Sequence, residues 1–130
     1  MKNQVKFILL CCFFVGVANS KLLAQNSENR SGKLVHTVFF KLKPEADANK
    51  MIQSLESLAK IEYIRKVEIG RYSDTGHTDI LSGHTLVVQM IFDNITAFKA
   101  YESHPIHLAS IKDTKELLAG PPIGYDYIVQ

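Results

Sequence analysis

The sequence has no tryptophan and only two cysteines, Cys11 and Cys12, which stand side by side near its start. Both lie in a stretch that we interpret as a removable leader, so the domain that follows has no cysteine. Disulfide bonds, thiolate catalysis and cysteine-ligated zinc are thereby excluded for that domain. The sequence also lacks a glycine-rich phosphate loop, a nucleophile elbow and a paired-carboxylate motif. A hydrophobic core, alone or with a partner subunit, must therefore hold the domain together.

Residues 1–24 have the pattern of a secretory leader. Two lysines give a positive start, and the run from Phe7 to Ala18 is almost wholly apolar. These 12 residues suit the core of a signal peptide and fall short of the roughly 20 that a membrane-spanning helix needs. We expect cleavage after Ala24, with Ser20 as the other position and an uncleaved membrane anchor as the alternative. The sequence thus predicts an exported protein, periplasmic or extracellular.

The formal net charge of +2 comes from the leader. Lys2, Lys6 and Lys21 belong to the leader, which leaves 12 of the 15 basic residues, whereas all 13 acidic residues lie beyond position 24. The net charge of the remaining chain is therefore −1. Without an excess of positive charge, a broad nucleic-acid-binding surface is disfavoured. We also expect no membrane association once the leader is removed.

Hydrophobic patterning predicts one domain, residues 33–130, after a polar and flexible tether at residues 25–32. Pro105 is expected to interrupt the second helical region because proline cannot continue a helix. The predicted order is β-α-β-β-α-β. Strands are expected at 34–43, 64–72, 85–92 and 125–129, and helices at 45–61, 95–104 and 106–118.

Two of the expected strands are apolar on both faces, which two helices on one side of the sheet cannot cover. A second surface must therefore cover the other face, and for so short a chain a second copy is the economical partner. We predict a homodimer through the sheet. The alternating residues of the first strand are Leu34, His36, Val38 and Phe40 on one face, with Val35, Thr37 and Phe39 on the other.

His107 is the strongest candidate for acid–base chemistry, because an imidazole exchanges protons near neutral pH. Tyr101 lies six residues earlier, across the proline break, so both side chains can turn toward one cavity. Its hydroxyl would orient the imidazole or stabilise an enolate. The alternative is a structural corner, in which His104 and His107 bond backbone groups that Pro105 leaves free.

His36 lies in the middle of an apolar strand face. It is either a hydrogen-bonded core residue or a member of a pocket that it shares with His107. A metal site is a further alternative, with His104 and His107 as ligands and Asp79 or His84 as the third. The sequence has no HExxH motif, and a proline disturbs the spacing between the first two ligands. We therefore expect no metal and no cofactor.

Several segments together carry a family resemblance. They are VHTVFFKLKP at 35–44, VEIGR at 67–71, YESHPIH at 101–107 and YDY at 125–127. In this order they resemble the stress-responsive A/B barrel family, over residues 33–129. The family fold is a ferredoxin-like α+β unit, an antiparallel sheet with helices on one face, which pairs through its sheet into a dimeric α/β barrel. The resemblance implies that fold, a homodimer and a role in stress responses.

The resemblance also implies a site. One plant member of the family is a polyketide cyclase with a pocket between sheet and helices. Its Tyr/His acid–base pair matches Tyr101 and His107, and its first-strand pocket histidine matches His36. The resemblance therefore implies Tyr101 and His107 as the catalytic candidates and His36 as a substrate contact.

Three further contacts complete the expected site. The third-strand pocket histidine of the cyclase falls at Leu86, with His84 two residues earlier on the same face, and His104 belongs to the HPxH motif. Two functions stay open. One is the binding of a small apolar or carbonyl-containing molecule, and the other is a polyketide-cyclase-like lyase reaction. A third, an interaction module whose sheet recruits another protein, is the weaker alternative.

Overall fold

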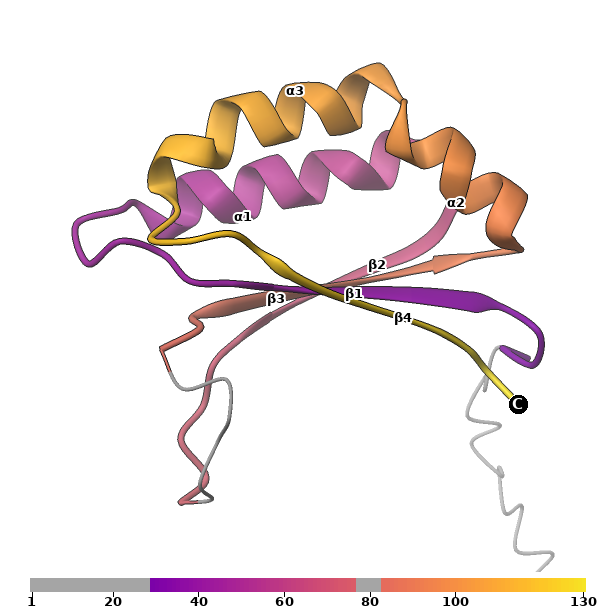
Figure 1. The fold of residues 1–130 in the computed structure, drawn as a ribbon, viewed down its shortest axis with the longest axis horizontal. Helices are drawn as coiled ribbons and strands as arrows, with labels where there is room; N and C mark the ends of the chain where they lie inside the picture. Colours follow the sequence, from indigo (N-terminus) through magenta and orange to yellow (C-terminus); the bar gives the residue numbers. More distant parts are fainter. Residues whose placement is uncertain (1–28, 77–82) are drawn as a thin grey trace, which may run out of the picture.

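The computed structural model describes residues 29–76 and 83–130 (Figure 1). The predicted leader, residues 25–28 of the tether and Asp79 lie outside the described residues. The described elements are β1 (Leu34–Phe40), α1 (Ala48–Ser57), the 3₁₀ turn η1 (Leu58–Lys60), β2 (Ile64–Arg71), β3 (Leu86–Phe92), α2 (Ile95–Glu102), α3 (Pro105–Thr114), the 3₁₀ turn η2 (Lys115–Leu117) and β4 (Ile123–Ile128).

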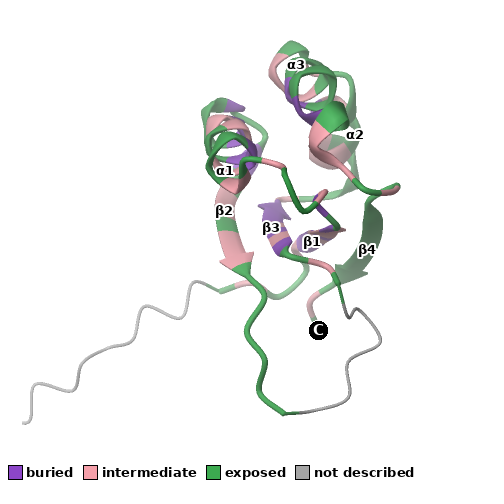
Figure 2. Ribbon diagram, turned by 90° about the vertical axis from the view of Figure 1, so that its left-hand side faces the viewer, coloured by how far each residue is buried: buried purple, intermediate pink, exposed green. Residues whose placement is uncertain are grey.

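The predicted β-α-β-β-α-β order and the ferredoxin-like fold are confirmed. The strands form one sheet in the order β2-β3-β1-β4, and every neighbouring pair is antiparallel. The helices lie together on one face of this sheet, and the opposite face has no helix over it within the described residues (Figures 1 and 2). None of the helices in residues 29–76 and 83–130 is both long and apolar enough to cross a bilayer.

Side-chain caps fix where the helices begin. The side chain of Asp47 accepts a hydrogen bond from the Asn49 amide at 2.9 Å, so α1 starts after the expected position. Asn94 caps α2 by accepting from the Ala97 amide at 3.0 Å. Pro105 occupies the first turn of α3, where its missing N–H costs nothing. The predicted interruption of the helix is therefore confirmed.

The last strand begins earlier than the sequence indicates. β4 starts at Ile123 because that residue pairs with Phe39 across the β1–β4 ladder. The first strand ends earlier, at Phe40, and Leu42 makes only an isolated bridge with Leu118. These boundaries depend on pairing between segments far apart in the chain, which a local pattern does not report.

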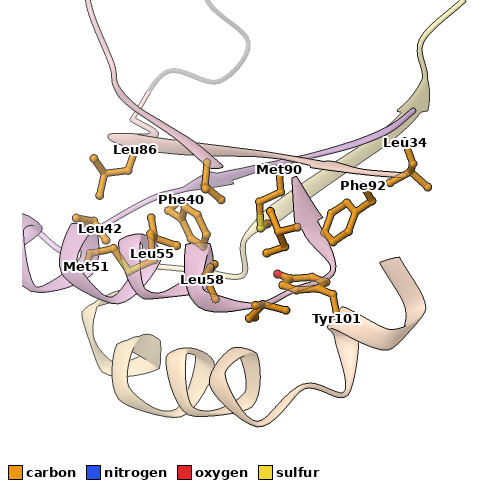
Figure 3. Close-up of a cluster of buried hydrophobic side chains, with 13 residues drawn as sticks. Leu34, Phe40, Leu42, Met51, Leu55, Leu58, Leu86, Met90, Phe92 and Tyr101 are labelled. Atoms are coloured by element: carbon orange, nitrogen blue, oxygen red, sulfur yellow. The ribbon is translucent and has the colours of Figure 1, made fainter. Parts of the chain in front are cut away.

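The hydrophobic core lies between the sheet and α1, and Figure 3 shows its side chains pointing from both layers toward each other. Phe92, Met51 and Ile61 are its largest fully buried side chains. Tyr101 joins this core from α2 and is 2% exposed. The core thus extends beneath the junction between α2 and α3. Two residues beside that junction, Tyr101 and His107, belong to the candidate site.

The face of the sheet away from the helices is called here the outer face. Apart from Thr37 and Gln89, β1 and β3 are apolar there as expected, and β4 adds exposed aromatic residues, of which Tyr125 is 65% exposed. The apolar surface left in water on this face belongs mostly to β4, because Val35 and Ile91 are only 1% and 3% exposed in a single copy. The outer-face residues of these three strands are Val35, Thr37 and Phe39; Val87, Gln89 and Ile91; and Ile123, Tyr125 and Tyr127.

Candidate functional site

A cavity of about 280 Å³ lies between the helix-facing side of the sheet and the helices α1 and α3. Its wall is mostly apolar, and its polar groups come from β1, from α2 and from successive turns of α3. Ile111, whose side chain is half-exposed, is one of its lining residues. The apolar wall is Val38, Phe40, Met51, Leu55, Leu58, Val88 and Met90; the polar groups are His36, Tyr101, His107, Ser110 and Thr114; the rest are Ile111, Pro122 and Gly124.

His107 lines this cavity from the first turn of α3. Its Nδ1 lies 3.0 Å from the Glu102 carbonyl oxygen at the end of α2. A carbonyl oxygen only accepts hydrogen bonds, so Nδ1 of the neutral ring must carry the proton. The lone pair of the neutral imidazole is then on Nε2. His107 is thus held in the tautomer that can accept a proton at Nε2.

Tyr101 stacks on His107, with ring centroids 4.1 Å apart and an angle of 28° between the planes. Burial raises the pKa of the Tyr101 hydroxyl well above its usual range, and the carboxylates of Glu102 and Asp126 raise it further. The hydroxyl therefore stays protonated at neutral pH, and no other described residue accepts its hydrogen bond. Tyr101 can donate to a ligand oxygen but cannot serve as the base.

His36 enters the cavity from the middle of β1 and is paired with Asp126 of β4. The strand register places the two residues opposite each other, and Nδ1 of His36 lies 2.5 Å from Oδ1 of Asp126. A carboxylate in this position accepts a hydrogen bond from Nδ1–H and holds the orientation of the ring. The sequence analysis missed Asp126. In the sequence, Asp126 stands out as the one charged residue of an otherwise uncharged last strand. That it pairs with His36 follows only from the register of β4 against β1.

Three of the six predicted contacts do not line the cavity. Leu86 is 2% exposed and packs in the core, and His84 lies just before β3, outside the cavity wall. His104 caps α3: its Nδ1 accepts from the Ile106 amide at 3.2 Å, and its Nε2 lies 3.5 Å from a carboxylate oxygen of Glu62. His104 and His107 both bond backbone groups beside Pro105, as the structural-corner alternative expects, and His107 also shares the cavity with His36 and Tyr101.

The inward face of α3 carries two hydroxyls that the sequence analysis did not single out. Ser110 and Thr114 are 7% and 4% exposed and line the cavity one and two turns after His107. The Ser110 hydroxyl bonds that of Ser54 on α1 at 2.8 Å, and Thr114 donates to the Ser110 carbonyl at 2.6 Å. Residues 107, 110 and 114 are three and four positions apart, so in the sequence they already indicate one polar face of a helix.

Metal ligation has no support in the described part of the chain. Across residues 29–76 and 83–130, no three His, Cys, Asp or Glu side chains are grouped so that they could hold a metal ion. His104 and His107 direct their Nδ1 atoms at backbone groups of the α2–α3 junction. Asp79, considered above as a third ligand, lies outside the described residues.

Known proteins resemble this chain over its whole described domain. A stress-response A/B barrel domain-containing protein of Arabidopsis thaliana is 28% identical over 74 residues, which cover 56% of this chain and 66% of that protein, just under two thirds. A dimeric ferredoxin-like protein of unknown function from Bacteroides fragilis is 28% identical, with a TM-score of 0.57; the match covers 76% of this chain and 98% of that one.

A hydroxynitrile lyase from Passiflora edulis shares the fold at 16% identity and a TM-score of 0.63, covering 75% of this chain and 94% of that enzyme. At this identity the likeness shows the fold alone. The family model described as the stress responsive A/B barrel domain matches residues 34–128, which is most of the chain. The chain therefore belongs to the stress-responsive A/B barrel domain family.

Proposed function

We propose that the protein binds a small, largely apolar molecule with a carbonyl group in the cavity between its sheet and its helices. The observation that carries this proposal is the lining of the cavity, an apolar wall on which the rings of His36, Tyr101 and His107 lie close together. Small-molecule sites commonly combine apolar walls with a few polar groups that orient the ligand. Here the protonated hydroxyl of Tyr101 is the donor for a ligand oxygen, and the apolar wall holds the rest of the molecule.

Binding of acetophenone, a small aryl ketone, tests the proposal. Ile111→Trp is expected to weaken binding at least tenfold, because Ile111 lines the cavity and is 51% exposed, so that a larger ring can take up cavity space without disturbing the core. Leu108→Trp is the matched control, since Leu108 is 53% exposed on the same helix and does not line the cavity. Calorimetric titration measures both. Equal affinity in the two variants, or no binding by the wild type, contradicts the proposal.

We further propose that two copies pair through the outer face of the sheet. The support is the exposed apolar and aromatic surface of β4, at Ile123, Tyr125 and Tyr127, on a face of the sheet that no helix of the described residues covers. Relatives of the same fold from Bacteroides fragilis and Thermobifida fusca are described as dimeric. Burial of such a face against an identical one removes apolar surface from water on both copies.

We also propose that the protein is exported and loses residues 1–24. The support is the sequence of the leader, with its positive start and its short apolar run. Intact-mass measurement of the protein recovered outside the cytoplasm is expected to show a chain that begins at Gln25. A protein that keeps its first residues and stays in the membrane fraction would contradict this expectation and favour the uncleaved anchor.

A second candidate function is a lyase or cyclase reaction that begins with proton transfer beside the carbonyl group. The tautomer of His107 favours it, because a free lone pair on Nε2 is what a general base needs. The Tyr101 hydroxyl would stabilise the resulting enolate by donating a hydrogen bond. His36, held by Asp126, is a second imidazole at the same cavity.

A further inference from the structure

A row of polar side chains crosses the middle of the outer face. Thr37 is the central outward residue of β1, and in the strand register it stands opposite Gln89 of β3 and Tyr125 of β4. Tyr127 stands one step further along β4, and its hydroxyl reaches back to Gln89. We call Thr37, Gln89, Tyr125 and Tyr127 the polar row. On either side the outer face of β1 and β3 is apolar, with Val35 and Ile91 at one level and Phe39 and Val87 at the other. The edge strand β2 is charged on this face, with Glu68 opposite Gln89 and Lys66 opposite Ile91.

Hydrogen bonds within the polar row use only part of its capacity. The amide nitrogen of Gln89 donates to the Thr37 hydroxyl at 3.2 Å and to the Tyr127 hydroxyl at 3.4 Å. The side-chain oxygen of Gln89 receives no hydrogen bond from any described residue. Nor does any described residue accept from the hydroxyls of Tyr125 and Tyr127. The Thr37 hydroxyl, which accepts from Gln89, likewise donates to no described residue. The row therefore has a spare acceptor and three spare donors, all on the same face.

These spare groups restrict what can cover the outer face. Water satisfies them in a single copy, but an apolar partner surface would leave them buried and unpaired, which is costly. A second copy related by a two-fold axis presents the same row in reverse, so that each donor can meet an acceptor. The tyrosine side chains are exposed enough to reach across, since Tyr125 is 65% and Tyr127 is 40% exposed.

We propose that the polar row is a hydrogen-bonded seam at the centre of the homodimer and fixes how the two sheets are aligned. The tyrosine hydroxyls of each copy donate to the side-chain oxygen of the partner's Gln89. This inference rests on the homodimer proposed above, and it explains why the two sheets would align in one particular way. An outer face that was apolar throughout would allow several alignments, whereas a polar row in the middle of it is satisfied in one.

Gln89→Glu tests the seam, because it replaces the amide by a carboxylate of nearly the same shape. At pH 7.5 two carboxylates would be buried near the two-fold axis, and the donor to Thr37 would be lost. We expect the dimer dissociation constant to rise at least tenfold in sedimentation experiments over a range of concentrations. Gln53→Glu makes the same chemical change on the exposed side of α1, in the helix layer, and is expected to leave the dissociation constant unchanged.

The outcomes separate this inference from the homodimer itself. If the wild type and Gln89→Glu dimerise equally well, the seam is overturned and the homodimer stands. If the wild type stays monomeric at every concentration, the sheet-mediated homodimer fails, and the seam fails with it. Circular dichroism establishes that the Gln89→Glu chain is folded.

If the Gln89→Glu chain does not fold, the seam can still be tested on the wild-type protein. Nitration by tetranitromethane is compared at concentrations above and below the dissociation constant. Tyr125 and Tyr127 are expected to be protected in the dimer, whereas Tyr63, which packs against His104 on the helix side, keeps its reactivity. Equal nitration of Tyr125 and Tyr127 at both concentrations overturns the seam.

Discussion

Replacing His107 with alanine is expected to slow deuterium exchange at the methyl group of acetophenone by roughly 10²–10⁴-fold, the usual contribution of a positioned general base. The reason is the tautomer that the Glu102 carbonyl imposes, which leaves Nε2 of His107 as the proton acceptor in the cavity. Binding of the ketone should persist, because the Tyr101 hydroxyl and the apolar wall are still present. Nuclear magnetic resonance in D₂O follows the exchange, and calorimetry follows the binding.

His104→Asn is the matched control for this prediction. Asparagine retains a side-chain oxygen that can cap α3, and position 104 does not line the cavity, so the exchange rate should stay at the wild-type value. Unchanged exchange in His107→Ala would remove His107 from the mechanism. In that case the His36–Asp126 pair is the remaining base at the cavity, and His36→Gln should abolish the exchange instead.

Most of the fold could be predicted from the sequence because its signals are local. Alternating and β-branched runs mark the strands, apolar spacing marks α1, and Pro105 separates α2 from α3. The boundaries of β1 and β4 were missed because they are set by pairing between segments far apart in the chain, as between Phe39 and Ile123. A register of that kind has no local signature.

The candidate site was predicted less completely, for the same physical reason. His36, Tyr101 and His107 were identified by residue type, by position on apolar segments and by family resemblance, and the structure brings them to one cavity. Asp126 was missed because its role follows from the register of β4 against β1. Leu86 belongs to the same strand as the cavity-lining Val88 and Met90, and His84 lies just before that strand. Residue type alone does not tell which part of a strand lines a cavity.

The two histidines of the HPxH motif, His104 and His107, make different hydrogen bonds and have different roles. His104 accepts a hydrogen bond at Nδ1, so its neutral ring carries the proton on Nε2, whereas His107 donates at Nδ1 and leaves Nε2 without a proton. The two tautomers are opposite because Pro105 stands between the end of α2 and the start of α3. His104 therefore accepts from the free N–H of Ile106 at the start of α3, and His107 donates to the free carbonyl of Glu102 at the end of α2.

Phe92→Ala is expected to lower the free energy of unfolding by about 3–5 kcal/mol, the usual cost of emptying a large buried aromatic position. Phe92 is 0% exposed and packs against Phe98 and Tyr101, with ring centroids 5.4 and 5.1 Å away. Loss of its ring removes the support beneath Tyr101, so binding of acetophenone should weaken as well. Denaturant titration at a fixed protein concentration measures the change, since dimerisation makes stability depend on concentration.

Tyr72→Ala is the matched control, because this aromatic residue follows β2 and is 47% exposed. A change within about 0.5 kcal/mol is expected there, as for most surface substitutions. If Phe92→Ala costs no more than Tyr72→Ala, the aromatic cluster does not support the site. A large loss of stability with unchanged ketone binding would mean instead that Tyr101 is held by α2 and by its stacking on His107. Ketone binding and stability falling together would show that the core beneath α2 also positions the ligand donor.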